Sequence, residues 1–234
     1  TLVGCGFHQI YSNSLQSDDD ARLSGNEPVI MMNPLNKDMG CLRTSLIPGL
    51  LKAADLNVKH SNKDLRLFEL GHVHFNVEDA PNKVNENKYL SGIVTGRSIG
   101  DNVHSDTTLE DIYTLKGYLS TLFVKKLGMR MEIEKNDNCL GFDMSCSISI
   151  NRQDVGHLGR MANTWIRSMG LDLENVYGFE LDLEPIKRML GRKKVFKRVN
   201  PYPMITRDLN LVMPQEQEVG SIIEIFHKFG KKLI

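Results

Sequence analysis

The chain has 234 residues, of which 41% are hydrophobic and 25% charged, as is ordinary for a globular protein with one large domain or one domain and part of another. Its 29 Lys and Arg residues balance 29 Asp and Glu residues, so the net charge is zero, which excludes an overall basic nucleic-acid-binding surface. The four cysteines form no C-x-x-C pair, and the sequence has no signal-peptide pattern and no apolar run of eighteen residues. These features predict a cytoplasmic protein without a zinc site or a membrane span.

The first half of the chain favours short extended segments around one helix. Residues 1–16 resemble the end of a helix followed by a strand, 17–27 a polar loop, and 29–32 a short strand that must turn at Asn33-Pro34. Apolar residues at helical spacing predict a helix over 44–57, with Pro48 in its first turn. Strands are predicted at 65–75, apolar on both faces as in a central strand, and at 89–95.

The second half contains the strongest helical pattern and several alternating strands. Residues 109–127 repeat apolar residues on one helical face, with capping-box spacing between Thr107 and Glu110 and a terminal Gly128. Alternation predicts strands at 129–133, 146–150 and 155–161, the last two joined by a hairpin turn at 151–154. A helix at 164–169, a strand at 176–183 and a helix at 185–190 complete this part.

A basic run at residues 192–198 marks a change in composition. It is typical of an exposed linker, with contact to a nucleic-acid backbone as the alternative. A strand at 208–213 and a helix at 219–229 are predicted after it, so we expect a domain boundary near residues 191–197. Because the chain begins without Met and stops soon after its last helix begins, we also expect a piece of a longer protein with neighbours on both sides.

The order of elements predicts the fold class. Strands joined as hairpins, with only a few helices between them, disfavour a doubly wound parallel sheet. We therefore predict an α+β protein whose largely antiparallel sheet carries flanking helices.

No local motif predicts a catalytic or metal-binding residue. The sequence lacks G-x-x-x-x-G-K, G-x-G-x-x-G, H-E-x-x-H and G-x-S-x-G patterns. His72 and His74 would share one face of a strand, so a metal pair is conceivable, but polar residues on a partly exposed strand are the commoner case. The acidic run at residues 18–20 could attract a cation, although a solvated loop is the plainer interpretation.

Three groups of segments, in one order and at characteristic spacings, point to a family. They are GFHQIYS at residues 6–12; NPL at 33–35 with LRTSLIPGLL at 42–51 and LFELG at 67–71; and YP at 202–203 with RDLNLV at 207–212. Together they resemble the C-terminal part of the bacterial phenylalanyl-tRNA synthetase beta subunit, over essentially the whole chain.

This resemblance implies an architecture and a role. Residues 1–191 would form a non-catalytic module similar to the catalytic domain of class II synthetases, and residues 197–234 the truncated N-terminal part of a ferredoxin-like anticodon-binding domain. The module would bind the alpha subunit and help to position tRNA(Phe) in an alpha2 beta2 tetramer that attaches phenylalanine to tRNA. The whole enzyme would use ATP and Mg²⁺, but this fragment would bind no cofactor. The alternatives are a class II-like regulatory or binding subunit of another enzyme and an active ligase acting alone.

The resemblance also predicts that the fragment is inactive. Class II synthetases hold ATP through an Arg just after the strand that corresponds to residues 67–75, where this chain has Phe75. A phenyl ring cannot supply the guanidinium that binds phosphate. The late strand at residues 178–182 also lacks the glycines and the Arg that class II enzymes carry there.

Five residues remain as candidates for other roles. Arg43, Thr44 and Ser45 are candidates for a subunit interface, or else for capping the predicted helix and forming a structural ion pair. Arg207 and Asp208 are candidates for a role in tRNA binding, with a local salt bridge as the alternative.

Overall fold

The computed structural model describes residues 1–78, 83–99, 107–136, 138–190, 205–215, 217 and 219–230. The chain divides into two compact units, Thr1–Arg192 and Lys193–Ile234. Most of the basic run 192–198 therefore belongs to the second unit, and all of it lies outside the described residues.

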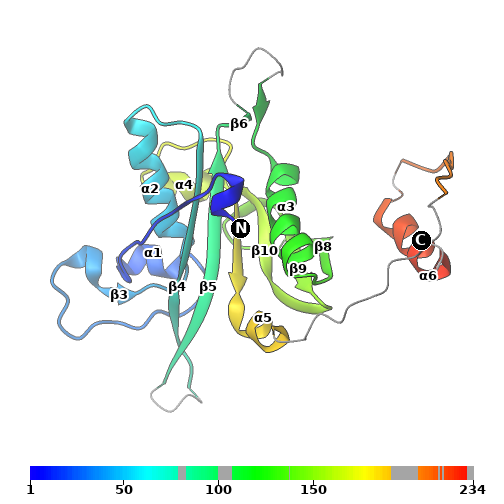
Figure 1. The fold of residues 1–234 in the computed structure, drawn as a ribbon. Coiled ribbons are helices and arrows are strands. Elements are labelled where there is room, and N and C mark those ends of the chain that lie inside the picture. Colours follow the sequence, from blue (N-terminus) through cyan, green and yellow to red (C-terminus); the bar gives the residue numbers. More distant parts are fainter. Residues whose placement is uncertain are drawn as a thin grey trace. The chain divides into compact units, whose positions relative to one another are not determined.

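A seven-stranded sheet forms the centre of the first unit (Figure 1). In spatial order its strands are β1 (His8–Gln9), β4 (Leu65–Asn76), β5 (Val84–Thr95), β11 (Tyr177–Asp182), β10 (Gln153–Met161), β9 (Phe142–Ile150) and β8 (Met131–Lys135). The α+β class is confirmed, but the sheet is mixed rather than wholly antiparallel, because β1 runs parallel to β4. Parallel neighbours need a long crossover, and here the chain between β1 and β4 contains a helix. All other neighbouring strands are antiparallel.

Two long hairpins carry most of this sheet. β4 and β5 pair without interruption from Leu65 opposite Thr95 to Asn76 opposite Val84. β9 and β10 meet in the predicted turn, where Asn151 and Arg152 both have positive φ angles. Two such residues in sequence match the right-handed twist of the flanking strands.

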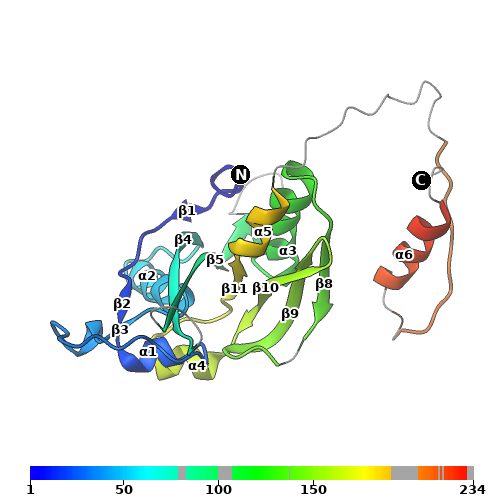
Figure 2. The same cartoon turned by 90° about the horizontal axis from the view of Figure 1, so that it is seen from below.

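Helices cover both faces of the sheet (Figure 2). α2 (Ile47–Lys59) and α4 (Asn163–Ser168) pack on one face, and α3 (Ile112–Ser120), a π-helical segment η3 (Thr121–Lys126) and α5 (Leu183–Met189) pack on the other. Neighbouring residues of β4 divide between the two cores, since Leu67 packs with α2 and Phe68 with the α3 side. The prediction of a central strand buried on both faces is therefore confirmed.

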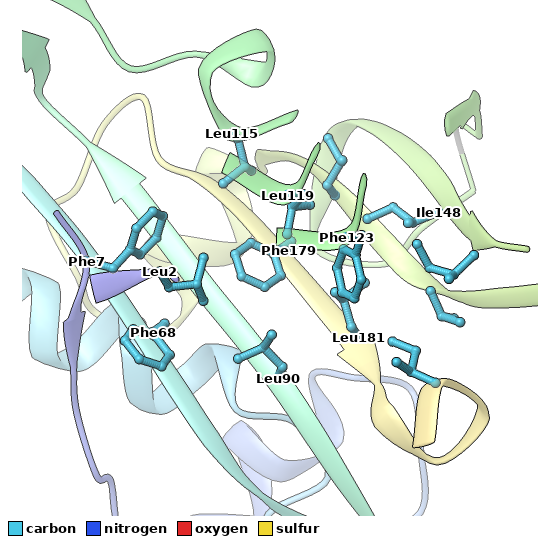
Figure 3. Close-up of a cluster of buried hydrophobic side chains, with 14 of the residues drawn as sticks. Leu2, Phe7, Phe68, Leu90, Leu115, Leu119, Phe123, Ile148, Phe179 and Leu181 are labelled. Atoms are coloured by element: carbon cyan, nitrogen blue, oxygen red, sulfur yellow. The ribbon is translucent and has the colours of Figure 1, made fainter. Parts of the chain in front are cut away.

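The core on the α3 side is built from large side chains (Figure 3). Leu115, Leu119 and Phe123 project onto Phe179 and Leu181 of β11, and each of these five is at most 1% exposed. Burial of one such side chain is worth roughly 1.5–3 kcal/mol, so β11 is anchored firmly on this face.

The predicted long helix at 109–127 begins later than expected. The predicted capping box between Thr107 and Glu110 is wrong, because Asp111 is the N-cap and exchanges hydrogen bonds with Thr114. The preceding residues are extended, since β7 (Thr108–Leu109) pairs with β6 (Arg97–Ile99). Glu110 is buried and bonds to Arg66 instead, with 2.5 Å between Arg66 Nε and Glu110 Oε1.

Short elements precede α2. The predicted loop at 17–27 contains the helix α1 (Asp18–Arg22), capped by the Ser17 hydroxyl, which accepts from the Asp20 N–H. The predicted strand at 29–32 is reduced to one bridge, between Ile30 and Cys41. The remaining elements are η1 (Val3–Cys5), β2 (Leu15–Gln16), η2 (Lys37–Met39) and β3 (Cys41–Leu42), with β2 paired to β3.

The second unit contains α6 (Val219–Gly230), which confirms the last predicted helix. The predicted strand at 208–213 is wrong for the described residues, because this segment belongs to none of the sheets and a strand needs a hydrogen-bonded neighbour. A ferredoxin-like domain therefore stays a prediction. Within the described ranges of both units, no helix is long and apolar enough to cross a bilayer.

Candidate functional site

A row of polar side chains crosses the middle of the sheet on the face that α2 covers. Glu69 of β4 lies opposite Ser91 of β5, Ser91 lies opposite Glu180 of β11, and Glu180 lies opposite His157 of β10. Residues directly opposite one another on neighbouring strands point to the same face. Glu69 and Glu180 are 1% and 7% exposed. Carboxylates at this depth need charged or hydrogen-bonding partners.

Arg43 supplies the partner of Glu69. Its Nη1 lies 2.7 Å from Glu69 Oε1, and neither side chain is more than 5% exposed. Arg43 Nε donates to the His72 carbonyl at 2.8 Å, and Nη1 donates to the Ser12 hydroxyl at 3.0 Å. Ser12 in turn donates to Glu69 through its N–H and its hydroxyl. The pair thus has the additional hydrogen bonds that a buried ion pair requires.

Gly71 leaves space for this guanidinium. A Cβ atom at residue 71 would overlap Arg43 Nη2, so only glycine fits without a shift. Two of the segments that resemble the family therefore meet in one buried cluster, since Arg43 comes from residues 42–51 and Glu69 and Gly71 come from residues 67–71.

Glu180 binds the start of α2. Its carboxylate accepts from the Ser45 hydroxyl at 3.0 Å and from the Leu46 N–H at 2.8 Å. Ser45 also accepts from the Ile47 N–H at 3.1 Å, so it caps the first turn from one residue before the N-cap. Burial raises the pKa of Glu180 to about 7, against the opposing effect of these donors.

All three candidate residues at the start of α2 are buried. Arg43 forms an ion pair and Ser45 binds a strand carboxylate, while Thr44 donates to the Ala21 carbonyl and accepts from Ser24 at 2.7 Å. These contacts hold α1 and α2 to the sheet, and a role at a subunit interface stays a prediction. Arg207 and Asp208 are exposed in irregular chain of the second unit, where their role in tRNA binding also stays a prediction.

Sequence reasoning missed the two carboxylates that organise this site. Glu69 and Glu180 each stand between apolar neighbours in a strand, in LFEL and GFEL. That isolation is the available signal, because a charge flanked by core residues on a central strand must be paired within the fold.

The other residues singled out in the sequence have structural contacts. The ring of Phe75 packs 6.2 Å from the ring of Tyr89, centroid to centroid. His72 Nδ1 lies 3.6 Å from Glu86 Oε1, and burial lowers the pKa of His74. The described residues contain no group of three His, Cys, Asp or Glu side chains that could hold a metal ion.

The acidic run forms the first turn of α1. Asp18 pairs with Arg22 at 2.9 Å, and Asp20 pairs with Lys52 at 2.5 Å. Acidic residues favour this end of a helix, whose N–H groups carry a partial positive charge. These carboxylates are therefore explained by the local fold.

Comparison with known proteins decides the family. Residues 1–183 match the model of the phenylalanyl tRNA synthetase beta chain CLM domain. The chain belongs to this family. Phenylalanine–tRNA ligase beta subunits from Listeria innocua, Bacteroides fragilis and Thermotoga maritima are 30%, 29% and 27% identical to this member over its whole length. The chain spans 29–30% of the length of these relatives.

Solved structures with the same fold include two of a pyrrolysyl-tRNA synthetase from Desulfitobacterium hafniense. They superpose on this family member with TM-scores of 0.59 and 0.60 at 16% and 14% identity, and cover 80% of the chain and 64% of the other chain. At such identity the match shows the fold alone. The predicted likeness to a class II synthetase fold is thereby confirmed for the sheet and its flanking helices.

Proposed function

We propose that this chain is a non-catalytic part of the beta subunit of a phenylalanine–tRNA ligase. It binds the alpha subunit in an alpha2 beta2 assembly and helps to position tRNA(Phe), while ATP and Mg²⁺ are used by the whole enzyme in the cytoplasm. The membership of the family and the names of the relatives support this assignment. The non-catalytic role is supported by the side chains on the α2-facing side of the sheet, which include two carboxylates and an arginine that is already paired.

The α2-facing side of the sheet carries buried carboxylates, whereas an ATP site needs positively charged side chains. Glu69 and Glu180 stand in the row, and Arg43 is already engaged by Glu69, Ser12 and the His72 carbonyl. Phe75 adds an apolar ring at the position where the resemblance places a phosphate-binding Arg. Because Glu69 and Glu180 are buried and the Arg43 guanidinium among them is already paired, this row offers no cation to a triphosphate.

An exposed apolar segment supports a protein partner for the first unit. Ile30, Met32 and Leu35 are 55%, 95% and 89% exposed, although methionine and leucine are usually buried. A group of exposed apolar side chains is typical of a protein-binding surface. We assign this segment to the contact with the alpha subunit. The candidate tRNA contacts, Arg207 and Asp208, lie in the second unit.

Pyrophosphate exchange tests the absence of catalysis. The purified 234-residue chain, given ATP, Mg²⁺ and phenylalanine, is expected to exchange pyrophosphate at the rate of a protein-free blank. The complete ligase of a relative is the positive control. Exchange well above the blank would support the alternative of an active ligase acting alone.

Association with the alpha subunit tests the role in assembly. In the complete beta subunit, the double variant Met32→Asp, Leu35→Asp should bind alpha at least tenfold more weakly, about 1.4 kcal/mol. Tyr113→Asp, at a 75% exposed aromatic residue on α3, is the matched control. Analytical ultracentrifugation measures the affinities. Equal affinity of the double variant and the wild type would contradict the assignment of this surface.

A further inference from the structure

Basic side chains gather at one end of the first unit, where α5, the end of η3 and the turn between β9 and β10 lie together (Figure 1). We call this group the terminal basic patch. Its members are all exposed, and they are Lys125, Arg130, Arg152, Lys187 and Arg188. Because the chain as a whole has no net charge, the patch is a local concentration of positive charge.

Asn151 connects the segments that carry the patch. Its side-chain oxygen accepts from the Arg130 N–H at 3.0 Å, and its own N–H donates to the Arg130 carbonyl at 2.8 Å. Its Nδ2 lies 3.7 Å from Sδ of Met189, at the end of α5. Lys125 comes five residues before Arg130, a span of at most about 18 Å. These contacts place the basic side chains on one continuous surface.

Most of the charge in the patch is not neutralised within the fold. Two members pair with neighbouring carboxylates, Arg130 with Glu132 at 2.6 Å and Lys187 with Glu184. The other members form no ion pair with any described residue, and they are Lys125, Arg152 and Arg188. Three cations are therefore available to a partner.

Arg152 occupies a turn position where glycine is usual. The φ angles of Asn151 and Arg152 are 51° and 69°, as in the two-residue turn that most often carries Asn-Gly. A side chain in this backbone region costs roughly 1–2 kcal/mol. Asp154, close by in sequence, accepts from the Gly156 N–H at 3.0 Å and forms no ion pair with Arg152. Lysines at helix ends are favoured by the helix dipole, but a strained, unpaired arginine in a strand turn indicates a partner outside the fold.

The positive charge of the patch continues along the sequence. Residues 185–207 contain eight Lys and Arg residues and no Asp or Glu. Lys187 and Arg188 are the first two of these basic residues, and both lie in α5. A long run of one charge sign is typical of segments that bind a polyanion such as a nucleic acid.

We propose that the terminal basic patch binds the phosphate backbone of an RNA. Guanidinium groups match pairs of phosphate oxygens, and lysine adds a point charge. Contacts of this kind orient a nucleic acid without reading its sequence. The choice of RNA as the polyanion rests on the function proposed above, in which the whole ligase holds tRNA(Phe).

The test measures how salt weakens RNA binding. The complete ligase is assembled with wild-type beta subunit or with the triple variant Lys125→Gln, Arg152→Gln, Arg188→Gln, and its affinity for a tRNA(Phe) transcript is measured over a range of salt concentrations. Each backbone contact contributes roughly 0.7–0.9 to the slope of log affinity against log salt. The triple variant should therefore lose about 2 from this slope and bind at least tenfold more weakly at low salt. A transcript of a different tRNA should show the same loss.

Two further variants separate the patch from general charge effects. Arg152→Gln alone should lower the slope by roughly 0.7–0.9. The control removes three exposed basic side chains outside the patch and should keep the wild-type slope, and its substitutions are Lys37→Gln, Lys63→Gln and Arg167→Gln. Circular dichroism establishes that each variant is folded, and Arg152→Gln decides alone if the triple variant is not.

Three outcomes overturn the proposal. The first is a wild-type slope in a folded patch variant, or an equal loss in the control. The second is weaker association of the triple variant with the alpha subunit in ultracentrifugation, which would assign the patch to a protein partner. The third is tighter binding of the wild type to phosphatidylserine vesicles than to the transcript. Wild-type binding of tRNA(Phe) with any of these outcomes leaves the proposed function intact, whereas a wild-type ligase that does not bind tRNA(Phe) overturns both.

Discussion

Glu69 and Glu180 lie on the same face of one sheet but are stabilised differently. Glu69 faces a guanidinium 2.7 Å away, and Glu180 faces a hydroxyl and a backbone N–H. Burial raises the pKa of Glu180 to about 7. Burial alone does not determine the behaviour of a carboxylate, because its partners decide which protonation state the fold favours.

The titration of Glu180 should make stability depend on pH. Its folded pKa of about 7 lies above the ordinary 4.5, so between these values the folded state binds more protons than the unfolded state. The free energy of unfolding should therefore fall as pH rises from 4.5 through 7, by on the order of 3 kcal/mol from this residue. Denaturant unfolding at several pH values should show this fall in the wild type and a smaller one in Glu180→Gln. If the free energy of unfolding of the two proteins changes with pH in parallel, Glu180 is not the titrating group.

Removal of one member of the buried ion pair should be costly. Arg43→Met leaves Glu69 charged and unpaired in the core, for which about 3–5 kcal/mol is expected. Arg22→Met is the control, because its pair with Glu27 is exposed and should cost at most about 1 kcal/mol. Urea unfolding measures both. A loss for Arg43→Met no larger than that of the control would show that the core accommodates the single charge.

At the level of elements, the periodicity of apolar residues predicted the middle of most helices and strands correctly but not the residues at which they begin and end. The 109–127 pattern contains α3 and η3, but its first turn is unwound by the pairing of β7 with β6. The run 129–133 begins two residues before β8. These boundaries depend on partners distant in sequence, which a local pattern cannot contain.

The cap of α3 can be tested directly. Asp111→Ala removes the acceptor of the Thr114 N–H and should lower the free energy of unfolding by about 1 kcal/mol. Lys116→Ala, on the exposed face of the same helix, should change it by less than about 0.5 kcal/mol. Thermal unfolding followed by circular dichroism compares them. An equal effect of the two substitutions would place the helix start elsewhere.

At the scale of the whole first unit, β11 joins two groups of strands. β1, β4 and β5 lie on one side of it, and β10, β9 and β8 lie on the other. The sequence predicted most of these strands individually, but it contained no signal that residues 177–182 would stand between residues 84–95 and 153–161. The order of elements predicted the α+β class, and only the structure gave the strand order and, with it, the row from Glu69 to His157.

Because β11 connects both groups, damage to it should destabilise the unit as a whole. Phe179→Ala should cost about 3–5 kcal/mol by opening a cavity between the sheet and α3. Tryptophan fluorescence, which reports on α4, and far-UV circular dichroism should shift together in urea, as in a single cooperative transition. Two separated transitions would show that the groups of strands unfold independently.

The position of β11 also bears on the order in which the unit is made. The β4–β5 hairpin and the β8–β9–β10 meander contain only neighbouring strands, so both can form while the chain is still being synthesised. Each then has an open edge, on β5 and on β10, until residues 177–182 emerge. Open strand edges pair readily with other chains. The unit is therefore most exposed to misassembly just before its last strand arrives, and it is completed in one late step.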